Sequence, residues 1–182
     1  VDYTFSLSPL TELAGKTMGF IGMGAIGTRS AIIAQALGMK TVCYHSRATL
    51  ENCEHLTLEE LLKVSDIVAL CCPVTQDNKN IICDSTISQM KDGAILINTA
   101  RGGLIDEHAL ARALNSGKLS YAALDVLKEE PPVNSSPLIS AKNCIITPHI
   151  AWAPKETRAR LLEETLKNIT AFLNGEKRNV VN

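Results

Sequence analysis

The chain has 182 residues, of which 46% are hydrophobic and 20% charged, and its formal net charge is −1. This length and composition favour one compact domain with a hydrophobic core. The mixed, nearly balanced charge argues against nucleic acid or an anionic membrane as a partner, and no apolar run approaches the roughly 20 residues of a membrane-spanning helix, so we expect a cytoplasmic protein.

An apolar run from Thr17 ends in Gly22-x-Gly24-x-x-Gly27, which predicts a strand, a tight turn and a helix. We expect residues 13–182 to form a dinucleotide-binding domain around this motif, and residues 1–12, which carry turn formers, to be an approach segment to it. We expect Gly22 to permit the turn, Gly24 to leave the backbone open to a pyrophosphate, and Gly27 to let the helix pack on its strand. The alternative is a glycine turn that is only structural.

The helix that follows this turn should extend to Gly38. Its first N–H groups, near Ala25 and Ile26, and the positive end of its dipole should face the anion. Apolar residues recur along it at helical spacing, namely Ile26, Ile33, Ala34 and Leu37.

Strands and helices continue to alternate along the rest of the chain. Further strands are predicted at 41–44, 67–71, 94–98, 121–125 and 144–147, and helices at 57–62, 85–90, 107–115 and 154–174. The last helix carries Leu162, Leu166, Ile169 and Leu173 on one face. Because the strands are continuous apolar runs, the predicted fold is α/β, a Rossmann-type doubly wound parallel sheet with helices on both faces.

The six cysteines include no Cys-x-x-Cys pair, so we expect neither a metal site nor a disulfide framework. Cys43, Cys71, Cys72 and Cys144 fall in apolar runs that are typical of buried strands. We interpret them as small hydrophobic residues.

The end of the second strand bears on which dinucleotide binds. A free ribose 2′-hydroxyl is usually held by an acidic side chain here, but no Asp or Glu occurs between Gly27 and Glu51. His45, Ser46 and Arg47 stand at this position instead and can donate hydrogen bonds, and the guanidinium suits a 2′-phosphate. The sequence therefore favours NADP(H) over NAD(H), unless Arg47 is an ordinary solvated loop residue.

Three reactive side chains follow later strands: Arg101, Glu130 and His149. Such folds bind ligands outside the carboxyl ends of their strands. A histidine can donate a proton to a carbonyl oxygen during hydride transfer, a carboxylate beside it raises its pKa, and an arginine can hold a substrate carboxylate. Each residue also has a purely structural explanation, as a solvated loop charge or a packed strand-end residue.

Four motifs together resemble the D-isomer-specific 2-hydroxyacid dehydrogenase family, from about Leu13 to the end of the chain. They are Gly22-Met23-Gly24-Ala25-Ile26-Gly27, the run 98–107, Leu124-Asp125-Val126 with Glu129-Glu130-Pro131, and Thr147-Pro148-His149-Ile150-Ala151-Trp152. The last motif and the ending Asn-Val-Val-Asn are most similar to the glycerate dehydrogenase and hydroxypyruvate reductase branch.

The resemblance implies roles for these residues. Arg101 would bind the substrate carboxylate and carbonyl, His149 would be the acid/base, and Glu130 would be its partner. Cofactor contacts are implied for Asp125, for the backbone around Cys72, Pro73, Thr99 and Ala100, and, as further candidates, for Asn78 and Ala151. The chain departs from the family pattern at His45, where an acid is common, and at Leu127 and Lys128, where Phe and an acid are common.

The family resemblance implies an NAD(P)-dependent oxidoreductase acting on a 2-keto or 2-hydroxy acid, such as hydroxypyruvate, D-glycerate or glyoxylate, and a homodimer. It also implies that the substrate-binding domain is absent from this chain, so we expect dinucleotide binding with little or no turnover. The alternative is a non-catalytic NAD(H)-sensing protein of the corepressor type, which shares the fold.

Overall fold

The computed structural model of the protein describes residues 10–46, 50–133 and 135–181. The chain divides into two compact units, Val1–Thr147 and Pro148–Asn182. Each unit is described separately below.

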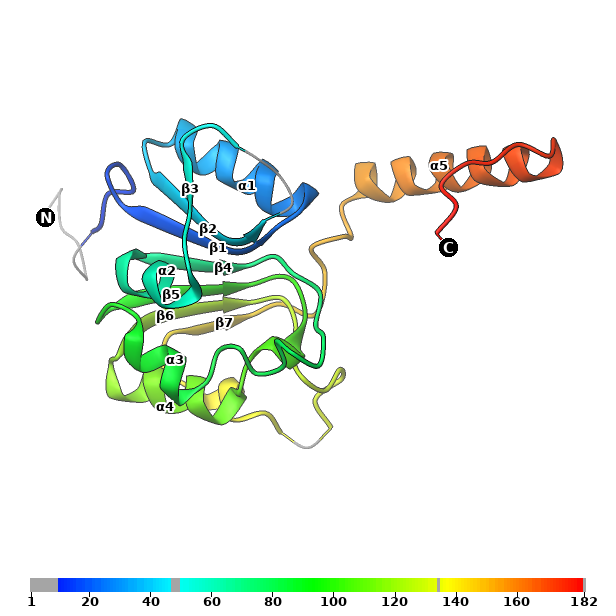
Figure 1. Cartoon of the computed structure of the whole chain (residues 1–182). Helices are drawn as coiled ribbons and strands as arrows, with labels where there is room; N and C mark the ends of the chain where they lie inside the picture. Colours follow the sequence, from blue (N-terminus) through cyan, green and yellow to red (C-terminus); the bar gives the residue numbers. More distant parts are fainter. Residues whose placement is uncertain (1–9, 47–49, 134, 182) are drawn as a thin grey trace, which may run out of the picture. The chain divides into compact units, whose positions relative to one another are not determined.

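The first unit is built on a parallel sheet, which has seven strands in the described part of the chain (Figure 1). The strands are β1 Thr17–Met23, β2 Lys40–Ser46, β3 Cys53–His55, β4 Ile67–Leu70, β5 Ala94–Asn98, β6 Leu119–Leu124 and β7 Cys144–Ile146. Their order is β3-β2-β1-β4-β5-β6-β7, so β2 and β3 lie on one side of β1, and β4 to β7 lie on its other side. This reversal at β1 is the doubly wound topology predicted from the sequence.

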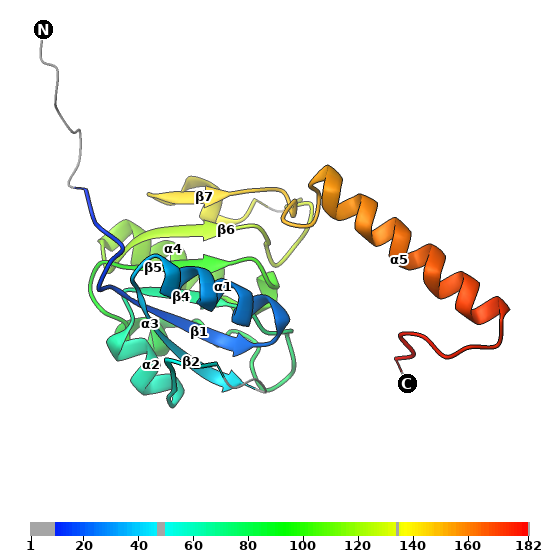
Figure 2. The ribbon, with the colours of Figure 1, turned by 90° about the horizontal axis from the view of Figure 1, so that it is seen from above.

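Helices cover both faces of this sheet, as predicted (Figures 1 and 2). Helix α1 lies on one face, and α2, α3 and α4 lie in a row on the other. Their bounds are α1 Ala25–Ala36, α2 Leu58–Val64, α3 Asp84–Gln89 and α4 Glu107–Ser116, with short 3₁₀ turns at η1 Gly102–Leu104 and η2 Pro137–Ser140.

Two helix starts follow from local chemistry that the sequence shows. Thr57 and Glu60 form a capping box at α2: the Glu60 N–H donates to Thr57 Oγ1 at 3.3 Å, and the Thr57 N–H donates to Glu60 Oε2 at 2.9 Å. At α4 the Asp106 carboxylate accepts the N–H groups of His108 and Ala109. Helix α4 ends at Gly117, whose φ is 80°.

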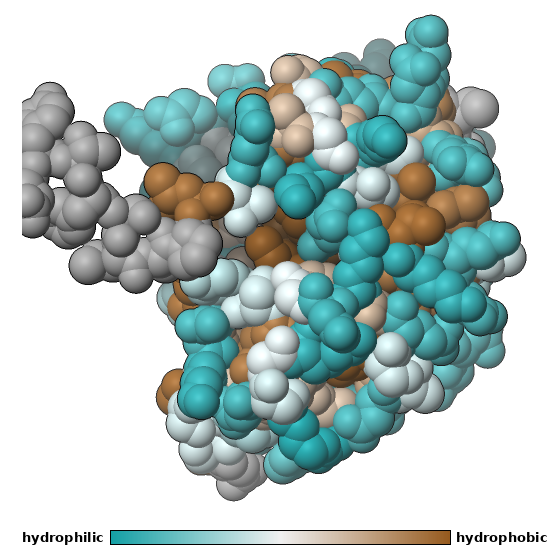
Figure 3. Space-filling model, turned by 90° about the vertical axis from the view of Figure 1, so that its left-hand side faces the viewer, coloured by the Kyte–Doolittle hydropathy of each residue, from teal (hydrophilic) through white to brown (hydrophobic). Residues whose placement is uncertain are grey.

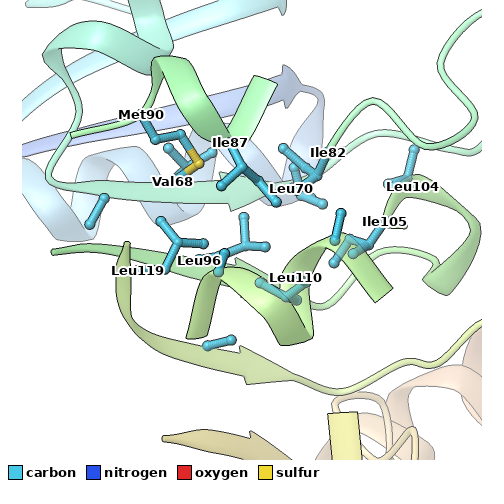
Figure 4. Close-up of a cluster of buried hydrophobic side chains, with 14 of the residues drawn as sticks. Val68, Leu70, Ile82, Ile87, Met90, Leu96, Leu104, Ile105, Leu110 and Leu119 are labelled. Atoms are coloured by element: carbon cyan, nitrogen blue, oxygen red, sulfur yellow. The ribbon is translucent and has the colours of Figure 1, made fainter. Parts of the chain in front are cut away.

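The main core fills the space between the sheet and helices α2 to α4 (Figure 4). Leu70 and Leu96 extend from neighbouring strands toward Ile87 of α3 and Leu110 of α4. Because these side chains are fully or almost fully buried, they fix the strands against the helices and so fix the loops at the carboxyl ends of the strands.

The large apolar residues that recur along α1 at helical spacing do not form its buried face. Ile26, Ile33 and Leu37 are 68%, 62% and 53% exposed, whereas the helix buries its small residues, among them Ala31 and Ala34. Close packing of the helix on the sheet leaves room only for small side chains on the inner face. The larger side chains therefore lie outward.

Several strand predictions are also corrected. The sequence analysis missed β3, which is only Cys53–His55. β4 ends at Leu70, so Cys71 and Cys72 lie just beyond the strand and are half-buried. β7 is an edge strand, and Cys144 within it is half-buried. Of the four cysteines assigned to buried strands, Cys43 is the one that fits that description.

The second unit contains helix α5, Lys155–Leu173. Pro154 precedes it and Gly175 follows it with a φ of 74°, within a residue of the predicted ends. The apolar side chains Leu162, Leu166 and Leu173 are exposed. Among the described residues, no helix combines the length and apolarity needed to span a bilayer.

Candidate cofactor and catalytic site

A groove of about 500 Å³ lies at the point where the strand order reverses. β1 and β4 pair directly there, with Ile21 opposite Leu70, and the chain turns away from the sheet just beyond both strands. Ligands of doubly wound sheets bind outside the carboxyl ends of the strands at such a point. Six residues predicted from the sequence to contact the cofactor line this groove: Gly22, Gly24, His45, Cys72, Pro73 and Asn78.

A second groove, of about 1020 Å³, is larger but lies at the opposite edge of the sheet, where the amino ends of β1 and β2 contribute Thr17, Lys40 and Thr41. Figure 3 views this edge, and hydrophilic side chains cover much of it. Because dinucleotides bind at the carboxyl edge, we assign the cofactor to the smaller groove.

The three glycines have the geometry that the fingerprint requires. Gly22 has a φ of +90°, and a Cβ there would lie 2.5 Å from Cys72 Cβ. A Cβ on Gly27 would lie 2.6 Å from the Gly22 carbonyl oxygen, so the start of α1 packs directly on the turn. A Cβ on Gly24 would meet no atom within 4 Å, and the backbone is therefore open to the groove at that residue.

The amino end of α1 is left open for an anion. Gly24 is the N-cap and supplies no side-chain hydrogen bond, and the first turn contains no acidic residue. Gly24, Ala25 and Ile26 are exposed. Unpaired N–H groups and the positive helix end at this point fit the pyrophosphate of a dinucleotide.

The groove reaches the end of β2, where a ribose would lie. His45 lines the groove, is exposed, and has a φ of 54°. Tyr44 packs edge-on against its ring, with ring centroids 4.5 Å apart. Arg47 and the side chain of Ser46 lie outside the described residues, so their part in cofactor choice stays a prediction. Asp77 also lines the groove, and the sequence analysis did not single it out.

Arg101 lies in the loop after β5, and a buried asparagine holds that loop. Asn98 Nδ2 donates to the Arg101 carbonyl oxygen at 2.9 Å, and Asn98 Oδ1 accepts the Ala100 N–H at 3.0 Å. Thr99 and Arg101 are exposed at this carboxyl edge, with the Arg101 guanidinium donating to the Ala100 carbonyl. The sequence analysis did not assign a role to Asn98, although a polar residue ending an apolar strand is a signal for one.

Glu130 lies in the loop after β6, and its Oε1 accepts the Leu127 N–H at 2.8 Å. The Glu107 carboxylate clamps this loop at two points, by accepting the Lys128 N–H at 2.8 Å and the Ser136 hydroxyl at 2.6 Å. The sequence analysis missed this role of Glu107. Because Glu107 opens α4, the clamp links the Glu130 loop to the segment that follows Arg101.

The same two segments are in direct contact. Gly102 packs so closely on the backbone of Leu127 and Lys128 that a Cβ there would overlap with it. Asp125, directly after β6, is buried; its N–H donates to the Asn98 carbonyl oxygen at 2.9 Å, and its Oδ1 accepts the Thr147 hydroxyl at 2.5 Å. The structure therefore brings the segments that carry Arg101, Glu130 and Asp125 together within the first unit.

His149 and Ala151 belong to the second unit. His149 is exposed, with a φ of 53° that a non-glycine residue seldom adopts. Because the two units are described separately, the grouping of His149 with Arg101 and Glu130 stays a prediction.

Two thiols stand beside the glycine turn. Burial raises the pKa of Cys71 to about 11 and also raises the pKa of Cys72. Both are therefore neutral near pH 7 and poor metal ligands or nucleophiles. Among the described residues, no cluster of three or more His, Cys, Asp or Glu side chains is arranged to hold a metal ion.

Comparisons with known proteins agree with this geometry. Residues 4–151 match the family described as D-isomer specific 2-hydroxyacid dehydrogenase, NAD binding domain. A hydroxypyruvate reductase from Blautia hydrogenotrophica is 50% identical over 185 residues, a match that spans 100% of this chain and 58% of the relative. This chain thus spans little more than half the length of that relative.

Two solved structures share the fold. An acyclic imino acid reductase in complex with NADPH and D-Arg superposes with a TM-score of 0.90 at 33% identity, covering 100% of this chain and 59% of that one. A D-lactate dehydrogenase from Aquifex aeolicus, complexed with NAD and lactic acid, superposes with a TM-score of 0.85 at 37% identity, covering 95% of this chain and 58% of that one. The chain therefore belongs to the D-isomer specific 2-hydroxyacid dehydrogenase family and contains its NAD-binding domain.

Proposed function

We propose that this chain is the cofactor-binding part of an NAD(P)-dependent oxidoreductase that interconverts 2-keto and 2-hydroxy acids, with hydroxypyruvate or glyoxylate as the keto acid. The observation that carries the proposal is the groove at the strand-order reversal, where the open backbone at Gly24 meets the uncapped start of α1. Relatives named for hydroxypyruvate and glyoxylate reduction support the substrate class.

The bound nicotinamide supplies or accepts the hydride, and the chain's own residues handle the substrate's charge and proton. The Arg101 guanidinium would hold the substrate carboxylate through paired hydrogen bonds. His149 would donate a proton to the carbonyl oxygen as negative charge develops on it. Glu130 would favour the protonated imidazole of His149 by its negative charge.

We propose NADP(H) as the preferred cofactor, since the sequence has no acid at the end of β2 and carries Arg47 two residues after His45. Calorimetric titration of the chain with NADPH and with NADH tests this directly. Arg47→Ala should weaken NADPH binding much more than NADH binding, because only NADPH carries the 2′-phosphate. Tighter binding of NADH by the wild-type chain would contradict the preference.

Catalysis by this chain alone should be slow. We propose that residues 13–182 form the dinucleotide-binding domain only; without a substrate-binding domain closing over it, water would not be excluded from half of the cleft. The test is a hydroxypyruvate and glyoxylate reduction assay with His149→Ala as the control. Turnover at ordinary enzyme rates by the 182-residue chain would refute this proposal.

We also propose that the chain forms a homodimer and works in the cytoplasm. The exposed side chains of Ile33 in α1 and of Leu37 at its C-cap support association, because exposed apolar groups that lie close together favour burial against a partner. Sedimentation velocity across a range of concentrations would detect the dimer, and a monomer at all concentrations would contradict it.

A further inference from the structure

The loop between β4 and α3 forms the wall of the groove that faces the glycine turn. Cys72, Pro73, Thr75, Asp77 and Asn78 all line the groove from this loop. The loop contains no helix or strand, because β4 ends at Leu70 and α3 begins at Asp84. Between Cys72 and Asn78 its backbone is held by side-chain hydrogen bonds, and backbone hydrogen bonds hold the part from Asn78 to Ile82.

The side-chain amide of Asn78 forms these hydrogen bonds with both its oxygen and its nitrogen. Its Oδ1 accepts the Thr75 N–H at 2.6 Å, and its Nδ2 donates to the Pro73 carbonyl oxygen at 2.8 Å. The same Nδ2 lies 3.7 Å from Cys72 Sγ, within reach of a weak hydrogen bond. The acceptor and the donors of the side chain are thus all directed back into its own loop.

The neighbouring residues are held to the rest of the fold from both sides. Cys72 packs against Gly22, where a Cβ would lie 2.5 Å from Cys72 Cβ. On the other side, the Asn80 N–H donates to the Gly103 carbonyl oxygen at 3.0 Å. Asn78 closes the part of the loop between these two anchors, and this part faces the groove.

We propose that Asn78 is a positioning residue for the dinucleotide: it fixes the backbone at 73–75 in the conformation that the bound cofactor requires, and it does not bind the cofactor with its own side chain. This inference rests on the proposed cofactor site. It replaces the sequence-based expectation that Asn78 is itself a cofactor contact. If this loop is already ordered in the free protein, it loses less conformational entropy when the cofactor binds.

The test compares the wild-type chain with Asn78→Ala, Asn78→Ser and the control Gln76→Ala. Gln76 is an exposed amide in the same loop and makes no side-chain hydrogen bond within the described residues. Two quantities are measured on each: the exchange rate of the Thr75 amide in the cofactor-free chain, by NMR, and the Kd for NADPH and NADH, by calorimetry. Circular dichroism confirms that each variant is folded.

Asn78→Ala should speed exchange at Thr75 and weaken cofactor binding about tenfold, while Gln76→Ala should change neither. Asn78→Ser keeps a hydroxyl that can accept and donate over a shorter reach, so both quantities should fall between those of the wild type and Asn78→Ala. This milder variant also serves if Asn78→Ala fails to fold.

Weaker binding with unchanged Thr75 exchange would overturn the inference in favour of a direct contact. Faster exchange with unchanged Kd would overturn it in favour of a role confined to the loop. If the wild-type chain bound neither cofactor, the proposed function would fall and this inference with it. That result is distinguishable, because the titrations of all four proteins with both cofactors would be flat while the exchange rates still reported on the loop.

Discussion

Gly24→Ala should separate cofactor binding from folding. A Cβ at this residue would meet no protein atom within 4 Å, and the backbone angles of φ −90° and ψ −158° suit any residue. Reduced freedom of the unfolded chain favours alanine by about 0.4–1 kcal/mol, and its weaker N-cap preference offsets part of that gain. The free energy of unfolding should therefore change by less than about 1 kcal/mol.

Binding should respond very differently, because the methyl group would occupy the space through which the pyrophosphate approaches the backbone. Hydrogen bonds to charged groups contribute about 1.5–3 kcal/mol each. Loss of one of them corresponds to a Kd that rises by about 10-fold to 100-fold, and loss of two to a rise of about 100-fold or more.

Gly27→Ala is the matched comparison. Its Cβ would lie 2.6 Å from the Gly22 carbonyl oxygen and 3.4 Å from Cys71 Cβ, so the helix must shift away from the turn. Overpacking of this kind costs about 1–3 kcal/mol of stability. Urea denaturation should therefore distinguish the two variants, and calorimetry should show that Gly24→Ala is folded yet fails to bind. If Gly24→Ala bound NADPH or NADH as tightly as the wild type, the pyrophosphate would not lie at this turn and the reasoning would be refuted.

Three further predictions concern single groups in the first unit. Burial raises the pKa of Cys72, so its alkylation by iodoacetamide should be slow at pH 7 and accelerate as the pH rises, and saturating cofactor should slow it further. Peptide mass spectrometry measures this rate, and equal rates with and without cofactor would argue against binding beside Cys72. For Asp66, partial burial acts to raise the pKa, but hydrogen bonds from the Thr17 N–H and Lys91 outweigh it and lower the pKa. A lowered carboxyl pKa stabilises the fold at pH values above about 4, the pKa of the carboxyl group in the unfolded chain, and this stabilisation is lost as the pH falls below that value. Asp66→Asn should therefore cost about 1 kcal/mol at pH 7 and progressively less in denaturation experiments toward pH 3. Glu107→Ala removes both hydrogen bonds of the loop clamp and should lower the urea-denaturation free energy by about 1–3 kcal/mol, whereas an unchanged value would show that the clamp contributes nothing to stability.

The sequence predicted the alternation of strands and helices and the glycine turn because these depend on local patterns. The capping box of Thr57 and Glu60 and the end of α4 at Gly117 likewise involve residues that are close together in the sequence. The three residues of β3 were missed because so short a strand has no periodicity of its own and forms by pairing with β2.

The side-chain roles that were missed depend on contacts between distant segments. Helical spacing identified Ile33 and Leu37 as one face of α1 but not which face would lie inward, since this is decided by how closely the helix approaches the sheet. Glu107 was visible as a first-turn acid, yet its contact with Ser136 joins residues 29 positions apart. The amide of Asn78 likewise binds only groups that the loop itself brings near.

The direct pairing of β1 with β4 affects the order in which the protein folds. Met18 lies opposite Ile67, so the two walls of the groove come from strands that a long crossover separates. A nascent chain that has emerged from the ribosome only as far as β3 carries the glycine turn with one wall missing. Parallel pairing between remote strands is slow to form, and affinity for the dinucleotide should therefore emerge late in refolding, after most of the helical signal has returned.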